Sequence, residues 1–189
     1  MAAEEANAIN VFRESKFLGK VYLYNQFILY HSVNRCDNMV EANSKAPDFR
    51  LKGSDGKEHT LSEFKGKYLV LYFYPKDDTP GCTIEAKGFN KKLEEIRKKG
   101  AEIVGVSKDD LKSHDKFCSK YGLEFLLLSD PESKAIKAYG AYGDRGIFGM
   151  GTLRNTYIID KKGKIAKVFE KVNPKGHEDE ILEALSSLD

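Results

Sequence analysis

The amino-acid sequence predicts an α/β domain in which a mixed β-sheet is flanked by α-helices. Two observations lead to this prediction. Between residues 68 and 138, short apolar runs rich in strand-forming residues alternate with segments of helical pattern. After them, two strand-like runs at 156–160 and 165–170 are joined by a KKGK turn, and an amphipathic helix closes the chain. Alternating strands and helices followed by a hairpin are typical of an α/β sandwich.

The individual elements follow in order along the chain. Residues 49–52 and 58–60 flank a GSDG turn and predict a small hairpin. The run YLVLYFY at 68–74 is continuously apolar, as expected of a central buried strand. The remaining expected elements are a helix at about 80–99 ended by Gly100, a strand at 101–106, a helix at 111–121 ended by Gly122, a strand at 125–128, a short helix at 131–138 and a helix at 177–188.

Charge and hydropathy exclude several classes of function. The 189 residues include 31 Lys and Arg against 29 Asp and Glu, a balance that argues against nucleic acid or an anionic membrane as main partner. The best candidate membrane segment, 21–33, has 13 residues, whereas a spanning helix needs about 20. Glu4 and Glu5 disfavour a secretory or organelle-targeting signal. A cytoplasmic protein is therefore expected, and three cysteines, an odd count, argue against a secreted disulfide framework.

The chain is expected to divide into an N-terminal extension, residues 1–44, and a single domain, residues 45–189. The extension is nearly balanced in charge, and its segment 21–30 fits either a short hairpin or a helix. Met39 begins a stretch of 151 residues (39–189) that is a complete domain by itself. Residues 1–38 are therefore expected either to reflect an upstream start or to pack on the domain or mediate association.

The segment PKDDTPGC, residues 75–82, joins the most apolar strand to the first long helix. Thr79 and Pro80 predict an N-cap followed by proline at the first helical position, which places Cys82 in the first turn. Free backbone amides and the helix dipole favour an anion there, so the nucleophilic thiolate is expected. The Thr79 hydroxyl is expected to hydrogen-bond the sulfur or an attacking oxygen. Pro75 is expected to keep the strand exit rigid and to shield the thiol.

The predicted helix also indicates where the thiol points. Apolar residues recur behind Cys82 at helical spacing, at Ala86, Phe89, Leu93 and Ile96. The cysteine therefore heads the inward face of the helix, at the rim of the core. A lone cysteine is often simply buried, but the strand, the proline and the capped helix together favour a reactive thiol.

The pattern Pro75-x-x-x-Thr79-x-x-Cys82 resembles the peroxiredoxin active-site signature, and the longer YFYPKDDTPGCTIEAKGF is similar to the bacterioferritin-comigratory, or plant-Q, subfamily. The resemblance covers about residues 45–189 and includes APDFRL and RNTYIIDKKGKI. It implies a thioredoxin-like fold and the reduction of hydrogen peroxide and organic hydroperoxides. Cys82 is then the peroxidatic cysteine, which attacks the terminal peroxide oxygen and becomes a sulfenic acid. No metal, haem or flavin cofactor is implied.

The family also supplies a fixed positive charge from an arginine at the start of a late strand, and Arg154 matches that position. Such a charge stabilises the thiolate and the departing oxygen. Arg50 and Arg145 are less favoured alternatives. Glu85, one turn along the helix from Cys82, is expected either to orient Arg154 or to be a solvated helix carboxylate.

A sulfenic acid has to be resolved by a second thiol before it is oxidised further. Many subfamily members carry that thiol five residues after the first, where this chain has Lys87. Other members carry it on the next helix, so the resemblance implies an intramolecular disulfide between Cys82 and Cys118, reduced again by thioredoxin or a similar dithiol. The alternatives are resolution by an external thiol and a Cys118 that only fills space. Cys36 is expected to be a bystander or to act between chains, and a monomer is favoured over a dimer.

Functions of other classes are less well supported. A thioredoxin-type reductase needs a C-x-x-C pair, and the four residues from Cys82 to Glu85 lack the second thiol. His114 and Cys118 are spaced to share a metal, but further zinc ligands are missing from the pattern. The glycines at 140–151 predict a flexible loop that delivers Arg154, not a nucleotide site. A binding or chaperone module without turnover remains the alternative from another class.

Overall fold

The computed structural model describes residues 40–188. The predicted extension therefore lies almost entirely outside the described residues, as do its 21–30 segment and Cys36. Within the described part of the chain, no helix is long and apolar enough to cross a membrane.

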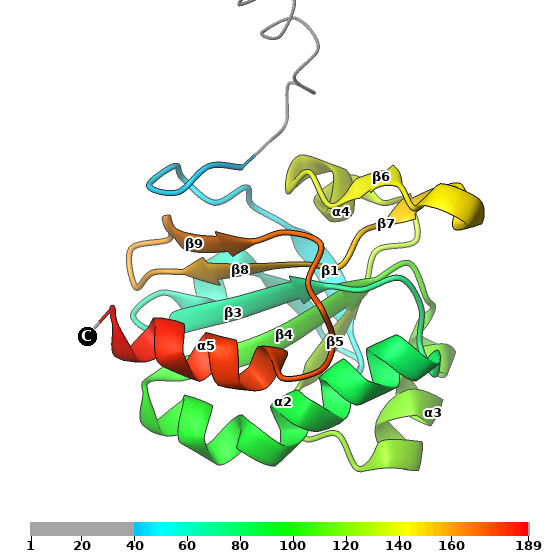
Figure 1. Ribbon diagram of the computed structural model, residues 1–189, viewed down its shortest axis with the longest axis horizontal. Helices are drawn as coiled ribbons and strands as arrows, with labels where there is room; N and C mark the ends of the chain where they lie inside the picture. Colours follow the sequence, from blue (N-terminus) through cyan, green and yellow to red (C-terminus); the bar gives the residue numbers. More distant parts are fainter. Residues whose placement is uncertain (1–39, 189) are drawn as a thin grey trace, which may run out of the picture. The chain divides into compact units, whose positions relative to one another are not determined.

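The main sheet is mixed, as predicted, with strand order β2-β1-β5-β4-β3-β8-β9 (Figure 1). Its strands are β1 Arg50–Gly53, β2 Glu58–Thr60, β3 Tyr68–Phe73, β4 Ala101–Ser107, β5 Leu126–Ser129, β8 Asn155–Ile159 and β9 Ile165–Phe169. β3 and β5 flank β4 in parallel, whereas β8 pairs antiparallel with both β3 and β9. β1 closes the other side, antiparallel to β5 and to β2, so the predicted first hairpin is confirmed.

Four α-helices of the described residues pack on this sheet (Figure 1). They are α2 Pro80–Lys98, α3 Leu111–Tyr121, α4 Lys134–Ala138 and α5 His177–Ser186. Residues of α2, α3 and α5 share one core cluster, and residues of α4 belong to a second cluster. The sheet is therefore covered on both faces, which is the layered arrangement that the sequence predicts.

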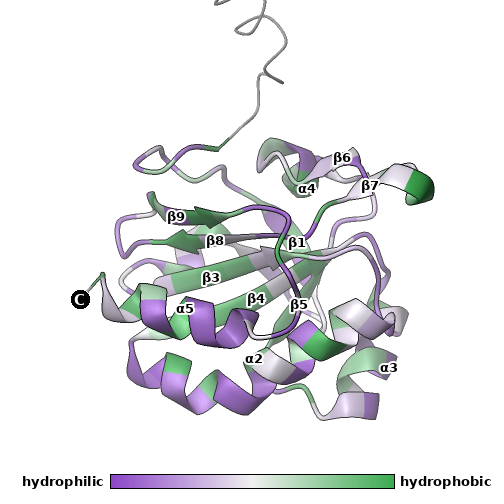
Figure 2. Cartoon of the chain, viewed as in Figure 1, coloured by the Kyte–Doolittle hydropathy of each residue, from purple (hydrophilic) through white to green (hydrophobic). Residues whose placement is uncertain are grey.

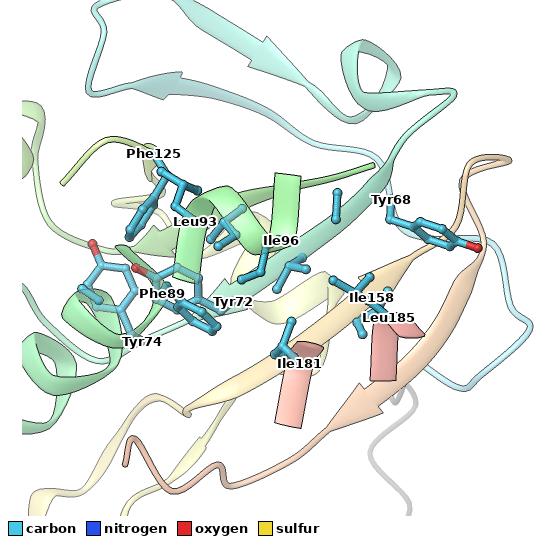
Figure 3. Packing of buried hydrophobic residues seen from close by; sticks show 14 of the residues in the cluster. Tyr68, Tyr72, Tyr74, Phe89, Leu93, Ile96, Phe125, Ile158, Ile181 and Leu185 are labelled. Atoms are coloured by element: carbon cyan, nitrogen blue, oxygen red, sulfur yellow. The ribbon is translucent and has the colours of Figure 1, made fainter. Parts of the chain in front are cut away.

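Strand β3 separates the two clusters because successive side chains of a strand point to opposite faces. Tyr68, Val70 and Tyr72 belong to the cluster under α2 and α5, whereas Leu69 and Leu71 belong to the other. Every residue of β3 is buried, which explains the unbroken apolar run of its sequence. Figure 3 shows Tyr72 of β3 beside Phe89 of α2. Figure 2 shows the hydrophobic strands behind helices with hydrophilic outer faces.

The glycine-rich segment before Arg154 differs from its prediction. It is not an irregular loop but a small hairpin, in which β6 (Tyr142–Asp144) pairs antiparallel with β7 (Met150–Thr152). A 3-10 turn, η2 (Gly146–Phe148), connects them, and Gly146 and Gly149 take positive φ values of 66° and 64° there. Left-handed backbone at two glycines closes a tight turn, so these glycines mark a hairpin connection.

Two further elements depart from the sequence expectation in smaller ways. The short helix α4 starts at Lys134, later than predicted, because Ser133 takes left-handed backbone (φ 57°, ψ 30°). The buried Asp130 carboxylate then accepts hydrogen bonds from the Lys134 and Ile136 amides. A 3-10 turn, η1 (Leu61–Phe64), follows β2 and has no counterpart in the prediction. Runs of this length give too few residues for a period to be recognised.

Candidate active site

The start of helix α2 has the backbone geometry that the sequence predicts. Thr79 is the N-cap in extended conformation (φ −87°, ψ 151°), Pro80 is the first helical residue, and the Thr83 amide donates to the Thr79 carbonyl at 2.8 Å. The Thr79 hydroxyl, however, donates to the Lys76 carbonyl at 3.0 Å and makes no capping bond. The expected contact between this hydroxyl and the sulfur is therefore not seen. Its oxygen lone pairs stay available as acceptors.

Cys82 lies in the first turn of α2, and its side chain is buried with 1 % of the residue exposed. The predicted stripe behind it is buried as well, from Ala86 through Ile96. The sulfur thus sits where the helix meets the core, at the end of the helix that favours an anion. This placement confirms the inward direction predicted for the thiol.

The sheet register brings Arg154 to the same place. β8 runs antiparallel to β3, and Asn155 pairs with Phe73 at the carboxyl end of β3. Arg154, immediately before Asn155, therefore lies beside the loop that leads from β3 to Cys82. The Arg154 carbonyl also accepts a hydrogen bond from the Val172 amide at 2.9 Å, which fixes its backbone.

The Arg154 guanidinium contacts both the thiol and a carboxylate. Its Nη2 donates to Cys82 Sγ at 3.3 Å, and its Nη1 donates to Glu85 Oε2. Burial favours the neutral form of Arg154, but attraction to Glu85 and Cys82 outweighs it and raises the pKa of the guanidinium. A fully charged donor is thereby held at the sulfur. Of the three arginines considered, Arg50 is instead paired with Glu58 at the surface.

Glu85 is the buried partner of Arg154 rather than a solvated helix carboxylate, with 1 % of the residue exposed. Burial raises the pKa of Glu85 to about 7, although the Arg154 charge and hydrogen bond act in the opposite direction. Its Oε1 atom is buried and has no protein partner. The orienting contact that the sequence left open is therefore present.

Gly81 is a site residue that sequence reasoning missed. A Cβ atom at this position would lie 3.1 Å from Arg154 Nη2. The missing side chain lets the guanidinium approach the first turn of α2 closely, beside the thiol. Glycine after the Thr-Pro cap is the signal for such a close approach.

Pro75 is half-buried at the exit from β3, where the preceding Tyr74 amide still donates to the Val106 carbonyl at 3.1 Å.

Asp77 and Asp78, which follow in the same loop, were also missed by the sequence reasoning. The buried Asp77 accepts a hydrogen bond from the Tyr74 hydroxyl at 2.7 Å and pairs with His114 Nδ1 at 2.8 Å. Burial alone raises the pKa of Asp77, but the hydrogen bonds from His114 and Tyr74 outweigh it and hold the pKa below its usual range.

Cys118 lies on α3 and is half-buried against the core cluster that contains Cys82. The Cys82 and Cys118 thiols are both free in this structure. Burial raises the pKa of the Cys118 thiol, and donation from the Ser54 hydroxyl to the sulfur only partly opposes this. Within residues 40–188, no group of three or more His, Cys, Asp or Glu side chains is arranged to hold a metal ion.

The family profile described as the AhpC/TSA family matches residues 42–168 of this chain. The chain belongs to this family. Among its relatives is a putative peroxiredoxin bcp of Helicobacter pylori, 48 % identical over 149 residues that cover 77 % of this chain and 98 % of the relative. The peroxiredoxin Bcp of Bacillus subtilis is 45 % identical over 152 residues, or 79 % of this chain and 97 % of the relative. A chloroplastic peroxiredoxin Q of Populus jackii is 41 % identical over 180 residues, or 93 % and 84 %.

Solved structures of similar proteins agree with this fold. A cysteine-to-serine mutant of Xylella fastidiosa PrxQ superposes with a TM-score of 0.76 at 33 % identity, covering 79 % of this chain and 97 % of that one. The bacterioferritin comigratory protein of Xanthomonas campestris, described for its alkyl peroxide reduction activity, gives 0.74 at 38 % identity, covering 78 % and 99 %. The chain is therefore a peroxiredoxin of the Bcp and peroxiredoxin Q type with a thioredoxin-like fold, as the sequence resemblance implied.

Proposed function

We propose that this peroxiredoxin reduces hydrogen peroxide and organic hydroperoxides with Cys82 as its nucleophile. The observation that carries the proposal is the 3.3 Å contact between Arg154 Nη2 and Cys82 Sγ. A charged donor at a buried sulfur in the first turn of a helix stabilises the thiolate, which is the reactive form. The alkyl peroxide reduction ascribed to the Xanthomonas campestris relative supports the same substrate class.

In the first step, the Cys82 thiolate forms a bond to the terminal oxygen of a peroxide, ROOH, and the O–O bond breaks. Cys82 becomes a sulfenic acid, and the departing RO⁻ takes up a proton from water and leaves as ROH. Arg154 lies beside the reacting atoms and stabilises the negative charge as it moves from sulfur to oxygen. Glu85, which accepts from the same guanidinium, keeps that charge aimed at the sulfur.

Thr79 and Pro75 are proposed to complete the site. The Thr79 proton is directed to the Lys76 carbonyl, so the Thr79 oxygen is free to accept a hydrogen bond from the hydroxyl of a bound peroxide. Pro75 has no amide hydrogen, and its ring stands half-buried at the loop entrance, where it limits access of water to the thiol.

In the second step, we propose that Cys118 resolves the sulfenic acid. The Cys118 thiolate attacks the Cys82 sulfur, an S–S bond forms, and hydroxide leaves and is protonated to water. A thioredoxin-type dithiol then reduces the disulfide by thiol exchange and is itself oxidised. Cys82 and Cys118 are 36 residues apart, the same separation as the two cysteines replaced by serine in the Xanthomonas campestris peroxiredoxin Q mutants. This agreement in spacing supports the assignment.

The test measures peroxide consumption with thioredoxin, thioredoxin reductase and NADPH for the parent chain, Cys82→Ser and Cys118→Ser. We expect turnover by the parent, none above background with Cys82→Ser, and loss of thioredoxin-dependent turnover with Cys118→Ser. Non-reducing peptide mapping after one equivalent of peroxide should recover a peptide pair joined through Cys82 and Cys118.

Each alternative gives a different result in the same experiment. Parent activity no greater than that of Cys82→Ser indicates a binding or chaperone module. A Cys82 that is joined only to an external thiol, with Cys118→Ser fully active, indicates a one-cysteine peroxidase. We further propose a monomeric protein in the cytoplasm, which sedimentation and cell fractionation test directly.

A further inference from the structure

A buried hydrogen bond ties the loop in front of Cys82 to helix α3. Asp77, five residues before Cys82, pairs through Oδ2 with His114 Nδ1 at 2.8 Å, and the two side chains are 3 % and 0 % exposed. The Tyr74 hydroxyl donates to the other oxygen of Asp77 at 2.7 Å, and Asp109 Oδ2 accepts from the Asp77 amide at 2.9 Å. The loop is thus fixed at Asp77 by groups from the residue that follows β3, from the β4–α3 connection and from α3.

The next residue makes a second, exposed tie to the same helix. Asp78 accepts a hydrogen bond from Lys120 Nζ at 2.6 Å and another from the Tyr121 hydroxyl at 2.6 Å. The Lys120 and Asp78 side chains are 55 % and 45 % exposed. Exposed ion pairs contribute little, whereas breaking a buried pair leaves a polar group without a partner. The bond between Asp77 and His114 is therefore the stronger of the two ties.

Cys118 lies on α3 between these two ties. His114 is one helical turn before it, and Lys120 and Tyr121 are two and three residues after it. Any rotation or unwinding of α3 that turns Cys118 toward α2 therefore displaces at least one of these residues. A movement of the loop in front of Cys82 likewise displaces Asp77 or Asp78 from its partner on α3.

The two thiols lie against the same core cluster but have different polar neighbours. Cys82 Sγ accepts from Arg154, which precedes β8, whereas the neighbour that most lowers the pKa of the Cys118 thiol is Ser54, which follows β1. In the sheet, β5, β4 and β3 lie between β1 and β8. A disulfide requires Cα atoms within about 7 Å and the correct direction of both side chains. Both thiols are free in this structure, so forming the disulfide requires at least one of the two side chains to move toward the other.

The second nitrogen of His114 has no partner among the described residues. Nδ1 of His114 is directed to a carboxylate oxygen, whereas Nε2 is buried without a protein partner. A fully buried imidazole with one unsatisfied nitrogen costs free energy compared with an apolar side chain of similar size. The hydrogen bond to Asp77 is the favourable interaction that offsets this cost.

We propose that His114 is a positioning residue for the resolution step: its bond to Asp77 holds the Cys82 loop on α3 during the reaction with peroxide and has to break before Cys82 and Cys118 join. This inference rests on the proposed role of Cys118. The bond between His114 and Asp77 would also set how long the sulfenic acid persists. A long-lived sulfenate attacks a second peroxide, becomes a sulfinate as a further ROH leaves, and is lost to the cycle.

The test compares two substitutions at His114 with a matched control. His114→Leu removes the donor, whereas His114→Asn keeps an amide donor near the position of Nδ1. His177→Asn is the control, because His177 is an equally buried histidine whose partners, Thr156 and Glu180, lie away from the loop and α3. Asp77→Asn, which retains a polar group, serves as a second route if His114→Leu does not fold.

Acid-quenched single turnovers analysed by mass spectrometry give the rates of sulfenic acid and disulfide formation separately. In His114→Leu we expect disulfide formation to be roughly tenfold faster, corresponding to about 1.4 kcal/mol, while sulfenic acid formation changes by less than about threefold. Asp77→Asn should be faster than the parent in the same step. His114→Asn and His177→Asn should stay close to the parent, and His114→Leu should form less sulfinic acid at high peroxide.

Three results overturn the proposal. Disulfide formation in His114→Leu and Asp77→Asn that is no faster than in the parent shows that the bond does not limit resolution. Equal acceleration in His177→Asn shows that general destabilisation is responsible. A parent that forms no disulfide between Cys82 and Cys118 overturns the resolving role itself, and peptide mapping of the parent distinguishes that failure from the other two.

Discussion

Arg154 places one guanidinium nitrogen 3.3 Å from the sulfur of Cys82, although 72 residues separate them in the sequence. The contact exists because β8 pairs antiparallel with β3, so that the start of β8 meets the end of β3. The same guanidinium binds Glu85 on the second turn of α2. The Cys82 thiol, the Arg154 guanidinium and the Glu85 carboxylate thus form one chain of contacts. Substitutions of these residues are expected to affect catalysis and stability differently.

Replacing Arg154 is expected to slow the reaction with peroxide strongly. In Arg154→Lys the charge remains, but a single ammonium cannot contact Cys82 and Glu85 with the geometry of the planar fork. Loss of one donor to developing negative charge typically lowers a rate by about a hundredfold or more. Stopped mixing of reduced protein with hydrogen peroxide measures this rate, and Arg50→Lys, at an exposed arginine, is the matched control. An unchanged rate in Arg154→Lys contradicts the proposed role.

Glu85 is expected to make the stability of the fold depend on pH. Its pKa is raised from 4.5 to about 7 by burial, so the folded state holds a proton that the unfolded state has already released. The contribution of Glu85 is therefore fully present below pH 4.5 and is lost as the pH rises to about 7. Urea unfolding at several pH values should show this loss, on the order of 3 kcal/mol.

The matched variant for this measurement is Glu85→Gln, which has the same shape and does not titrate. The difference in unfolding free energy between the parent and Glu85→Gln should shift in favour of the variant as the pH rises through this range. A difference that stays constant with pH shows that Glu85 remains ionised in the folded protein throughout.

Local patterns predicted the elements on which the site is built. The helix at 111–121 ends as expected at Gly122, whose φ is 60°, because only a residue tolerant of left-handed backbone closes the helix there. The unbroken apolar run of β3 and the buried stripe behind Cys82 followed in the same way from period and capping. Arg154 required the family resemblance, since nothing in its own neighbourhood distinguishes it from a surface arginine.

Contacts between distant segments were not predictable from the sequence. Asp77 and His114 are 37 residues apart, and each taken alone fits a solvated loop or helix position. Only the parallel pairing of β3 with β4 brings the following loop and helix together. The hairpin of β6 and β7 was missed for a different reason, because strands of three residues have no period that can be recognised.

Two tyrosines on the same face of β3 and its exit are expected to respond in opposite ways to loss of the hydroxyl. The Tyr72 hydroxyl is buried without a protein partner, whereas the Tyr74 hydroxyl donates to Asp77. A buried unsatisfied hydroxyl is costly, and a buried hydrogen bond to a carboxylate is favourable. Tyr72→Phe should therefore keep or raise the unfolding free energy, and Tyr74→Phe should lower it by about 2 kcal/mol. Equal losses in urea unfolding contradict the assignment of the two hydroxyls.

Gly81 offers a test of the close approach of Arg154 that leaves both the thiol and the guanidinium chemically intact. In Gly81→Ala the added Cβ would lie 3.1 Å from Arg154 Nη2, so the guanidinium has to move away from the first turn of α2. Alanine is more favourable than glycine in a helix by about 1 kcal/mol. The fold of Gly81→Ala should therefore be at least as stable as that of the parent. We expect the rate of reaction with peroxide to fall by roughly tenfold, because the donor to the sulfur is displaced.

Gly88→Ala is the matched control for this variant, on the same helix. There the added Cβ would meet the Glu178 carboxylate at 2.5 Å, the far end of a flexible side chain that does not contact the sulfur. The control should gain the same helical preference and keep the parent's rate. If Gly81→Ala also reacts at the parent's rate, the fit between Gly81 and Arg154 has no part in catalysis. If both variants slow equally, the effect belongs to the helix and not to the guanidinium.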